Sequence, residues 1–176
     1  MIKTPRSTKE HKERSPKSIT TAIITMSDSR TLETDESGRA IRDFLESDGL
    51  KVAQHVICKD EPLELDQELD NALAAKVDAI IINGGSGVSP RDVTIEVVSP
   101  RLEKTMEGFG ELFRMISYQE IGSSAMLSRA TAGVCNGVAI FCLPGSPDAV
   151  KLAMNRLILP EIRHIVGMIR YAHTRG

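Results

Sequence analysis

Five residues with the sequence NGGSG, at positions 83–87, carry the clearest chemical signal in this chain. They follow the apolar run 79–82, so the glycines come at the end of an expected buried strand. Glycine has no Cβ and tolerates positive φ, so such a loop lets the backbone approach a ligand closely. Successive backbone N–H groups in a loop of this kind can form a concave anion site. The segment therefore predicts a phosphate-binding loop.

The residues after this loop add charge and hydroxyl groups. Asp92 supplies a carboxylate of the kind that a phosphate-bound Mg²⁺ requires, and Arg91 adds a cation where an anion would sit. Two plainer interpretations stay open, because glycine is also the usual turn former and because Asp92 or Thr94 could simply cap the next helix. The segment is neither a Walker A loop, which needs Lys followed by Ser or Thr, nor a G-x-G-x-x-G fingerprint.

The composition indicates an ordinary globular domain. The 176 residues are 41% hydrophobic and 26% charged, and a chain of this length can bury a substantial core. The net charge of −2 gives no case for nucleic acid or a lipid surface as partner, and 3% of aromatic residues is too few for base stacking. No apolar run reaches the roughly 18 residues of a membrane-spanning helix, and the N-terminus lacks the apolar segment of a signal peptide. We therefore expect a cytoplasmic protein.

Three cysteines, Cys58, Cys135 and Cys142, lie in apolar runs that are typical of strands. Their number is odd and no C-x-x-C spacing occurs, so we expect small core residues in a reducing compartment rather than zinc ligands or a catalytic thiol. The 4 histidines have no mutual spacing typical of a metal site. We assign none of them a catalytic role.

Residues 1–17 are predicted to form a disordered basic tail. This segment is poor in apolar residues and rich in Lys and Arg, so it cannot bury enough surface to fold by itself. We expect a solvated tail, with a nucleic-acid-binding arm as the alternative. The remaining residues, 18–176, are predicted to form one domain.

Apolar runs of strand length alternate with segments of helical spacing from residue 19 onward. Strands are expected at 19–25, 52–58 and 78–82, and at 132–136 and 138–143 on either side of the hairpin signal Asn136-Gly137. Helices are expected at 37–49, 62–75, 93–98, 108–118 and 123–130, and from Pro147 to about 170 with a kink or restart at Pro160. This order predicts a doubly wound α/β fold, with a mostly parallel sheet, helices on both faces and an antiparallel edge ribbon.

In such a sheet, ligands bind at the carboxyl ends of the parallel strands, near the point where the strand order reverses. This rule brings four loops to one edge of the sheet. The loops are 27–29, 58–60, 84–87 and 144–147. Together they offer backbone N–H groups, hydroxyl groups and carboxylates at one place.

These four loops, in this order, resemble those of the molybdenum cofactor biosynthesis proteins of the MoaB/MogA type, which share their fold with the G domain of gephyrin. The matching stretches are TMSDSR at 25–30, SGRAI at 37–41, NGGSGVSPRDVTIE at 83–96, FGELFRMISYQEIGSSAMLSRATAG at 109–133 and LPGSPDAVKLA at 143–153. The resemblance spans residues 18–170, and the fourth stretch is most similar to the MoaB branch. One departure is Ser86, where the family usually has Thr; the hydroxyl group is retained.

The resemblance implies that the chain binds molybdopterin and Mg-ATP and adenylates the terminal phosphate of the pterin, with release of pyrophosphate. Positioning and charge neutralisation dominate such a transfer. Asp92 and Asp60 match acidic positions of catalytically competent relatives, where they would hold Mg²⁺; Asp92 could instead orient the attacking phosphate. For Asp60, a helix-capping role before Pro62 stays open, as does Glu61 as the matching residue.

The same resemblance assigns further residues to substrate and nucleotide binding. The loop glycines and Ser86 would cradle a phosphate or pterin group, the first loop would line the pterin side, and the fourth loop would form the nucleotide side. Arg129 would bind phosphate bidentately beside Ser128. The predicted binding residues are Ser27, Asp28, Ser29, Gly84, Gly85, Ser86, Gly87, Thr94, Ser128, Arg129, Pro144, Gly145 and Ser146.

Three functions are compatible with this resemblance. The first is a molybdopterin adenylyltransferase, which the presence of both Asp60 and Asp92 favours. The second is a non-catalytic molybdopterin-binding or carrier protein, because a shared fold does not fix activity. The third, a generic nucleotide-binding domain such as that attached to nicotinamide-nucleotide amidases, is disfavoured by the stretch 109–133. Relatives form trimers or hexamers, so we expect a homo-oligomer, with other molybdenum cofactor biosynthesis proteins as further partners.

Overall fold

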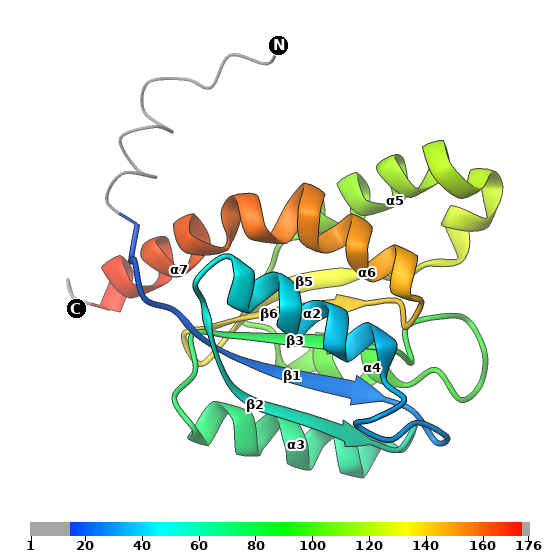
Figure 1. Cartoon of the computed structure of the whole chain (residues 1–176), viewed down its shortest axis with the longest axis horizontal. Helices are drawn as coiled ribbons and strands as arrows, with labels where there is room; N and C mark the ends of the chain where they lie inside the picture. The colour runs from blue at the N-terminus through cyan, green and yellow to red at the C-terminus, as the bar shows by residue number, and fades with distance from the viewer. Residues whose placement is uncertain (1–14, 174–176) are drawn as a thin grey trace.

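The computed structural model describes residues 15–173 and the side chains of 15–171, so most of the predicted basic tail lies outside the described residues (Figure 1). Six strands form one sheet in the order β2-β1-β3-β6-β5-β4. The strands are β1 (Thr20–Met26), β2 (Lys51–Cys58), β3 (Ala79–Asn83), β4 (Lys104–Thr105), β5 (Thr131–Cys135) and β6 (Val138–Leu143). Strands β2, β1, β3 and β6 are parallel, whereas β5 and β4 form an antiparallel ribbon at one edge. The predicted fold class is confirmed.

Helices cover both faces of the sheet (Figure 1). The helices are α2 (Glu36–Ser47), α3 (Pro62–Ala74), α4 (Thr94–Val98), α5 (Glu107–Ile121), α6 (Pro147–Ala153) and α7 (Leu159–His173), with 3₁₀ turns η1 (Ser99–Arg101) and η2 (Gly122–Leu127) and a π-helical turn η3 (Met154–Ile158). Helices α2, α5, α6 and α7 pack on one face, and α3 and α4 pack on the other. In the described part of the chain, none of the helices has the length and apolar character that crossing a membrane would require.

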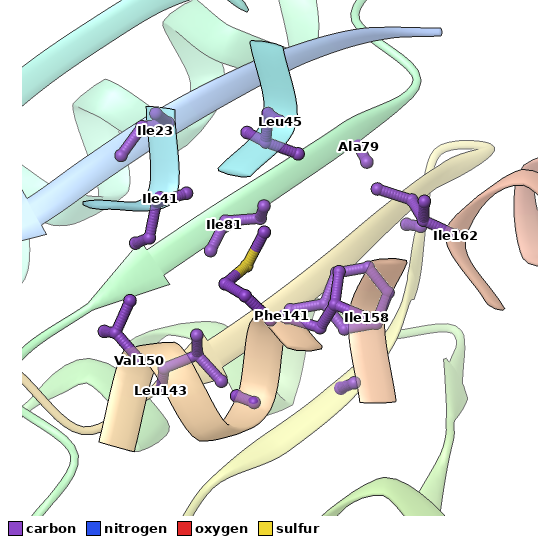
Figure 2. Close-up of a cluster of buried hydrophobic side chains, with 14 of the residues drawn as sticks. Ile23, Ile41, Leu45, Ala79, Ile81, Phe141, Leu143, Val150, Ile158 and Ile162 are labelled. Atoms are coloured by element: carbon purple, nitrogen blue, oxygen red, sulfur yellow. The ribbon is translucent and has the colours of Figure 1, made fainter. Parts of the chain in front are cut away.

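The two faces of the sheet are built by alternation along the strands. Ile23, Ile81 and Phe141 are neighbours across β1, β3 and β6 and lie in the larger core, under α2 and α6 (Figure 2). The residues that alternate with them, such as Ile24 and Ile82, face the smaller core under α3. This period-2 pattern fixes the register, because a slip by one residue would exchange the two faces.

The edge ribbon closes through the predicted hairpin turn. Asn136 and Gly137 have φ values of 49° and 75°, and positive φ at both central residues is the requirement of a type I′ turn. Cys58, Cys135 and Cys142 are buried free thiols, which confirms their prediction as core residues. Burial raises the pKa of the Cys58 and Cys142 thiols to about 12, so neither can act as a thiolate nucleophile at neutral pH.

The structure differs from the sequence-based expectation in three places. The helix expected at 123–130 is the 3₁₀ turn η2, which ends at Leu127, and residues 128–130 are not helical. Gly122, with a φ of 63°, ends α5 and interrupts the regular helix before this segment. Strand β4 was not expected, because two exposed residues show no pattern and only pairing with β5 defines them. The irregularity predicted at Pro160 is the π-helical turn η3 just before it, since proline has no N–H for the bond to residue 156.

Candidate active site

The four predicted loops meet at the carboxyl edge of the parallel strands. Backbone hydrogen bonds join them in pairs: Ser27 N–H donates to the Cys58 carbonyl over 2.9 Å, and Gly84 N–H donates to the Leu143 carbonyl over 3.1 Å. The close approach continues beyond Leu143, because a Cβ on Gly145 would lie 3.1 Å from the Cα of Gly84. The sheet therefore brings the 27–29, 58–60, 84–87 and 144–146 segments to one place, as predicted.

The GGSG loop (residues 84–87) takes a conformation that only glycine allows at its first two positions. Gly84 and Gly85 have φ values of 94° and 60°. A Cβ on Gly84 would lie 2.4 Å from the Met26 carbonyl oxygen, and one on Gly85 would lie 2.6 Å from Thr94 Oγ1. Glycine is therefore required at both positions, because it allows positive φ and because a side chain would clash with neighbouring atoms.

Thr94 fixes this loop from beneath. Its side chain is completely buried, and its hydroxyl donates to the Gly84 carbonyl over 2.8 Å. Its N–H donates to the Gly85 carbonyl over 2.9 Å. The structure therefore gives Thr94 a part in shaping the loop, and its direct contact with a ligand stays a prediction.

Arg129 braces the far end of the loop. Its Nε donates to the Gly87 carbonyl over 2.7 Å, one terminal nitrogen donates to the Asp92 carbonyl over 3.2 Å, and the guanidinium pairs with Glu96. The hydrogen bond from Arg129 holds the pKa of the Glu96 carboxyl below its usual range. Since this cation is already neutralised by Glu96, phosphate binding by Arg129 would require competition with that pair. Its role as a phosphate ligand stays a prediction.

A cavity of about 440 Å³ opens between the loop, the 144–146 turn and α5, which is within the size range of small-ligand pockets. Its polar rim is formed by 85–87, Asp92, Ser128 and 144–146. Its apolar wall is formed by Phe113, Ile121, Leu127 and Leu152. One side of the cavity is therefore lined by the glycine loop, hydroxyl groups and the Asp92 carboxylate, and the other by apolar side chains, with Glu120 and Asp148 as further acidic lining residues.

Three carboxylates surround the loop outside this cavity and at its rim. Asp60 N–H donates to Asp28 Oδ1 over 3.3 Å, and Asp28 also pairs with Arg91. Asp92 accepts a hydrogen bond from the Ser89 N–H over 2.7 Å. Burial and the negative charges of Asp28 and Asp92 raise the pKa of Asp60, although Arg91 opposes them. Negative charge is therefore concentrated at the mouth of the site.

The structure excludes the capping interpretation of Asp60. The N-cap of α3 is Glu61, and no side chain donates or accepts a capping hydrogen bond there. Asp60 Oδ1 lies 3.4 Å from the place of a Cβ on Gly85, whereas Glu61 lies 3.9 Å from Arg91. Asp60 is therefore not a helix cap, and Asp60 rather than its neighbour Glu61 lies against the GGSG loop. Its part in holding a metal stays a prediction.

The donor groups fit a magnesium ion that arrives with phosphate. Within residues 15–171, no group of three or more His, Cys, Asp or Glu side chains is arranged to hold a metal ion. Mg²⁺ needs only one or two carboxylates when substrate phosphates and water complete its octahedron. Asp60 and Asp92 can supply those carboxylates. The pKa of Asp60 is raised first by burial and then by the negative charge of Asp28, and a cation would offset that charge.

Comparison with known proteins identifies the family. Residues 22–164 match a family described as a probable molybdopterin binding domain. The chain is 49% identical over 166 residues to molybdenum cofactor biosynthesis protein B of Bacillus subtilis, an alignment that covers 93% of this chain and 98% of that protein. The chain belongs to this molybdenum cofactor biosynthesis family.

Solved structures of the molybdenum cofactor biosynthesis family have the same fold. A crystal structure of a molybdenum cofactor biosynthesis protein B superimposes with a TM-score of 0.86 at 48% identity, over 89% of this chain and 99% of that chain. The tungsten cofactor synthesizing protein MoaB from Pyrococcus furiosus superimposes with a TM-score of 0.82 at 35% identity, over the same shares. These matches span nearly whole chains of this family, which confirms the resemblance seen in the sequence.

Sequence reasoning missed four polar residues that lie behind the GGSG loop of this family member. Thr25, Asp35, His55 and Asn83 form a buried hydrogen-bonded chain. Two signals were available: Asp35 is a capping residue type that lies two positions before the predicted 37–49 helix, and Thr25 and Asn83 are polar residues at the ends of apolar runs. His55 gives no such signal, because a single histidine in a strand has no recognisable partner in the sequence.

Proposed function

We propose that this protein is a molybdopterin adenylyltransferase that uses Mg-ATP. One observation carries the proposal: the GGSG loop lies beside two carboxylates, Asp92 at the rim of the cavity and Asp60 outside it, against Gly85. Backbone N–H groups suit phosphate oxygens, and carboxylates suit the cation that accompanies them. The family assignment supplies the class of substrate, since the matching domain is described as molybdopterin binding.

The proposed reaction is a transfer of AMP. An oxygen of the terminal phosphate of molybdopterin attacks the α-phosphorus of ATP, the bond from the α-phosphorus to the bridging β-phosphate oxygen breaks, and pyrophosphate leaves. The GGSG loop would bind phosphate oxygens through its N–H groups, and Asp60 and Asp92 would hold Mg²⁺. When bound, Mg²⁺ would neutralise charge on the phosphates.

The cavity walls match the rest of the substrates. The apolar wall of Phe113, Ile121, Leu127 and Leu152 suits a planar ring, because such pockets combine apolar surface with a few polar groups. The 144–146 side of the cavity would receive the nucleotide, as the sequence predicts. Residues 27–29 do not line this cavity, and their contact with the pterin stays a prediction from the sequence.

A second candidate is a carrier that binds molybdopterin without turnover. The observation that favours it is the pairing of both cations at the loop, Arg91 with Asp28 and Arg129 with Glu96. With these charges satisfied inside the protein, less positive charge remains to stabilise a transferring phosphoryl group.

The decisive experiment incubates the purified protein with molybdopterin, ATP and Mg²⁺ and measures adenylylated pterin together with pyrophosphate. We expect equimolar products, and we expect Asp92→Asn to lower turnover by at least about 100-fold, since a lost charge-stabilising ligand acts on the transition state. Asp43→Asn is the control, because Asp43 is an exposed carboxylate on α2. Tight pterin binding without products would support the carrier, and a fully active Asp92→Asn variant would refute the role of Asp92.

We also propose that the protein forms a homo-trimer or a hexamer. Large apolar side chains on α5 and η2 are between 47% and 77% exposed. They are Leu112, Met115, Tyr118, Ile121, Met126 and Leu127. Surface of this kind is typical of an interface rather than of a monomer. Light scattering that gives the mass of a monomer at micromolar concentration would contradict this proposal.

A further inference from the structure

A chain of buried hydrogen bonds leads from the edge strand β2 to the start of the GGSG loop. His55 Nε2 lies 3.1 Å from Asp35 Oδ2, the Thr25 hydroxyl donates to the same oxygen over 2.6 Å, and Asn83 Nδ2 donates to Thr25 Oγ1 over 2.8 Å. The side chain of His55 is 4% exposed, and Asp35, Thr25 and Asn83 are 0%, 2% and 1% exposed. The four residues come from β2, the N-cap of α2, β1 and β3, so only the tertiary fold joins them.

An ionised Asp35 gives each hydrogen bond in this chain one direction. Burial alone would raise the pKa of Asp35, but hydrogen bonds from His55, Thr25 and Gly38 outweigh it and hold the pKa below its usual range. An ionised carboxylate only accepts, so His55 Nε2 and the Thr25 hydroxyl must donate to it. The Thr25 oxygen then accepts from Asn83 Nδ2, which fixes the amide of Asn83 in one orientation.

Two further features show that the fold makes room for this chain. A Cβ on Gly38 would lie 2.1 Å from Asp35 Oδ2 and 2.4 Å from His55 Nε2, so any larger residue would separate the two groups. Asn83 Oδ1 is buried and has no hydrogen-bond partner among the described residues, an arrangement that natural cores rarely keep. An apolar core at this place would avoid the desolvation of these groups, so stability alone does not explain them.

The same end of α2 also reaches the fourth loop. The Ser37 hydroxyl donates to the Gly145 carbonyl over 2.7 Å, and Gly145 packs against the Cα of Gly84. Gly84 is therefore held from one side through Asn83, its neighbour in the chain, and from the other side through Gly145. The N-terminus of α2 is the common support of both contacts.

We propose that Thr25, Asp35 and His55 are positioning residues that act through Asn83 to hold the GGSG loop in its phosphate-binding conformation. They do not line the cavity, so they act on the loop and not on the substrate. The identity of the ligand rests on the proposed function. The effect of these residues on the conformation of the loop does not depend on which ligand binds. Preorganised N–H donors bind an anion more tightly than mobile ones, because less order is lost on binding.

The test compares two threonines of β1. Thr25→Val removes the hydroxyl that joins Asp35 to Asn83, and Thr25→Ser keeps it. Thr21→Val is the matched control, because Thr21 is also completely buried but its hydroxyl donates to the Lys51 carbonyl, away from the loop. Hydrogen exchange is followed by mass spectrometry in peptides that cover 83–87, where the Gly84 N–H is protected by the Leu143 carbonyl.

We expect Thr25→Val to speed exchange in these peptides by about tenfold relative to Thr21→Val, the change that the loss of one buried hydrogen bond would give. Binding of Mg-ATP by calorimetry should weaken by a similar factor, and Thr25→Ser should restore both. Equal exchange rates in Thr25→Val and Thr21→Val would overturn the proposal. Exchange in Thr25→Ser that is as fast as in Thr25→Val would also overturn it.

A second pair of variants covers the case in which Thr25→Val does not fold. His55→Leu removes the donor at the far end of the chain, where β2 is the edge strand, and His55→Gln keeps a donor. His55→Leu should speed hydrogen exchange in peptides that cover 83–87, and His55→Gln should not. Equal exchange rates in both variants would overturn the proposal. Absence of Mg-ATP binding in the unchanged protein would refute the adenylyltransferase instead, while the exchange data would still decide the positioning role.

Discussion

Asp35 and Asp60 lie on two sides of the same loop, and their surroundings shift their pKa values in opposite directions. Behind the loop, hydrogen bonds from His55, Thr25 and Gly38 outweigh burial and lower the pKa of Asp35. In front of it, burial and the charges of Asp28 and Asp92 raise the pKa of Asp60. One carboxylate is surrounded by donors, and the other is surrounded by like charge.

This difference separates a carboxylate that supports the fold from one that is available to a ligand. A buried acid with donors stabilises the native state, whereas an acid held beside like charges destabilises it until a cation arrives. Clusters of the second kind are typical of functional sites. The comparison predicts that substitutions on the two sides of the loop will change stability with opposite sign.

The largest expected effect is the loss of Asp35. Asp35→Ala removes the N-cap of α2 and leaves two buried donors unpaired, so the free energy of unfolding should fall by about 3–5 kcal/mol. Urea denaturation at pH 7 measures the change, with Asp43→Ala as an exposed control on the same helix. A loss below about 1 kcal/mol would mean that the donors find other partners.

The pH dependence of Asp35 has a definite sign. Its folded pKa lies below the unfolded value, so its stabilising contribution is present above the unfolded pKa, near 4, and is lost as the pH falls through the folded pKa. Asp35→Ala should therefore differ from the unchanged protein most at neutral pH, and the difference should shrink in acid. A difference that grows as the pH falls would contradict the assigned direction.

A smaller effect is expected at Gly38. Alanine is favoured over glycine inside helices by about 1 kcal/mol, yet Gly38→Ala should destabilise the protein by about 1–3 kcal/mol, because the new Cβ would separate Asp35 from His55. Gly108→Ala in α5 is the matched control, since a Cβ there meets nothing within 4 Å. Thermal unfolding of both variants tests this. Equal melting temperatures would show that Asp35 and His55 can move apart without loss of stability.

The smallest effect, and the one of opposite sign, is expected at Asp60. Because its folded pKa is raised, ionised Asp60 destabilises the native state at neutral pH, and Asp60→Asn should raise the free energy of unfolding by up to about 1 kcal/mol. The gain should vanish below about pH 4, where the acid is protonated in both states. The proposed adenylation activity should fall in the same variant.

Glu61→Gln is the control for that experiment, since Glu61 lies next to Asp60 in the chain but beside Arg91. We expect no gain in stability from this substitution, because it removes a favourable charge. If Glu61→Gln raised the free energy of unfolding and Asp60→Asn did not, Glu61 rather than Asp60 would be the carboxylate that destabilises the native state.

The sequence predicted the fold where local patterns agree with tertiary demands. The apolar runs of β1, β3 and β6 are buried throughout, so their β-branched and apolar residues alone indicate strands. It failed at β4, whose two exposed residues become a strand only by pairing with β5. It also failed at 123–130, where Gly122 and the packing of η2 replace a regular helix.

The candidate site was predictable in position but not in detail. The rule that ligands bind at the carboxyl ends of parallel strands located the four loops without coordinates of any side chain. The rule could not show that Arg129 pairs with Glu96, that Thr94 lies beneath the loop, or that Asp60 rather than Glu61 lies against it. Such contacts depend on distances between elements, which residue patterns do not contain.

By itself, the sequence determined the parallel strands, the main helices, the glycine loop and the family resemblance, because these follow from local patterns and short motifs. Only the tertiary structure decided that hydrogen-bond donors surround Asp35, whereas burial and like charges destabilise ionised Asp60. Asp35 meets His55 across 20 residues, and Asn83 meets Thr25 across 58. Hydrogen bonds and charges act over a few ångströms in space, so their partners, and the pKa values they set, exist only once the chain has folded.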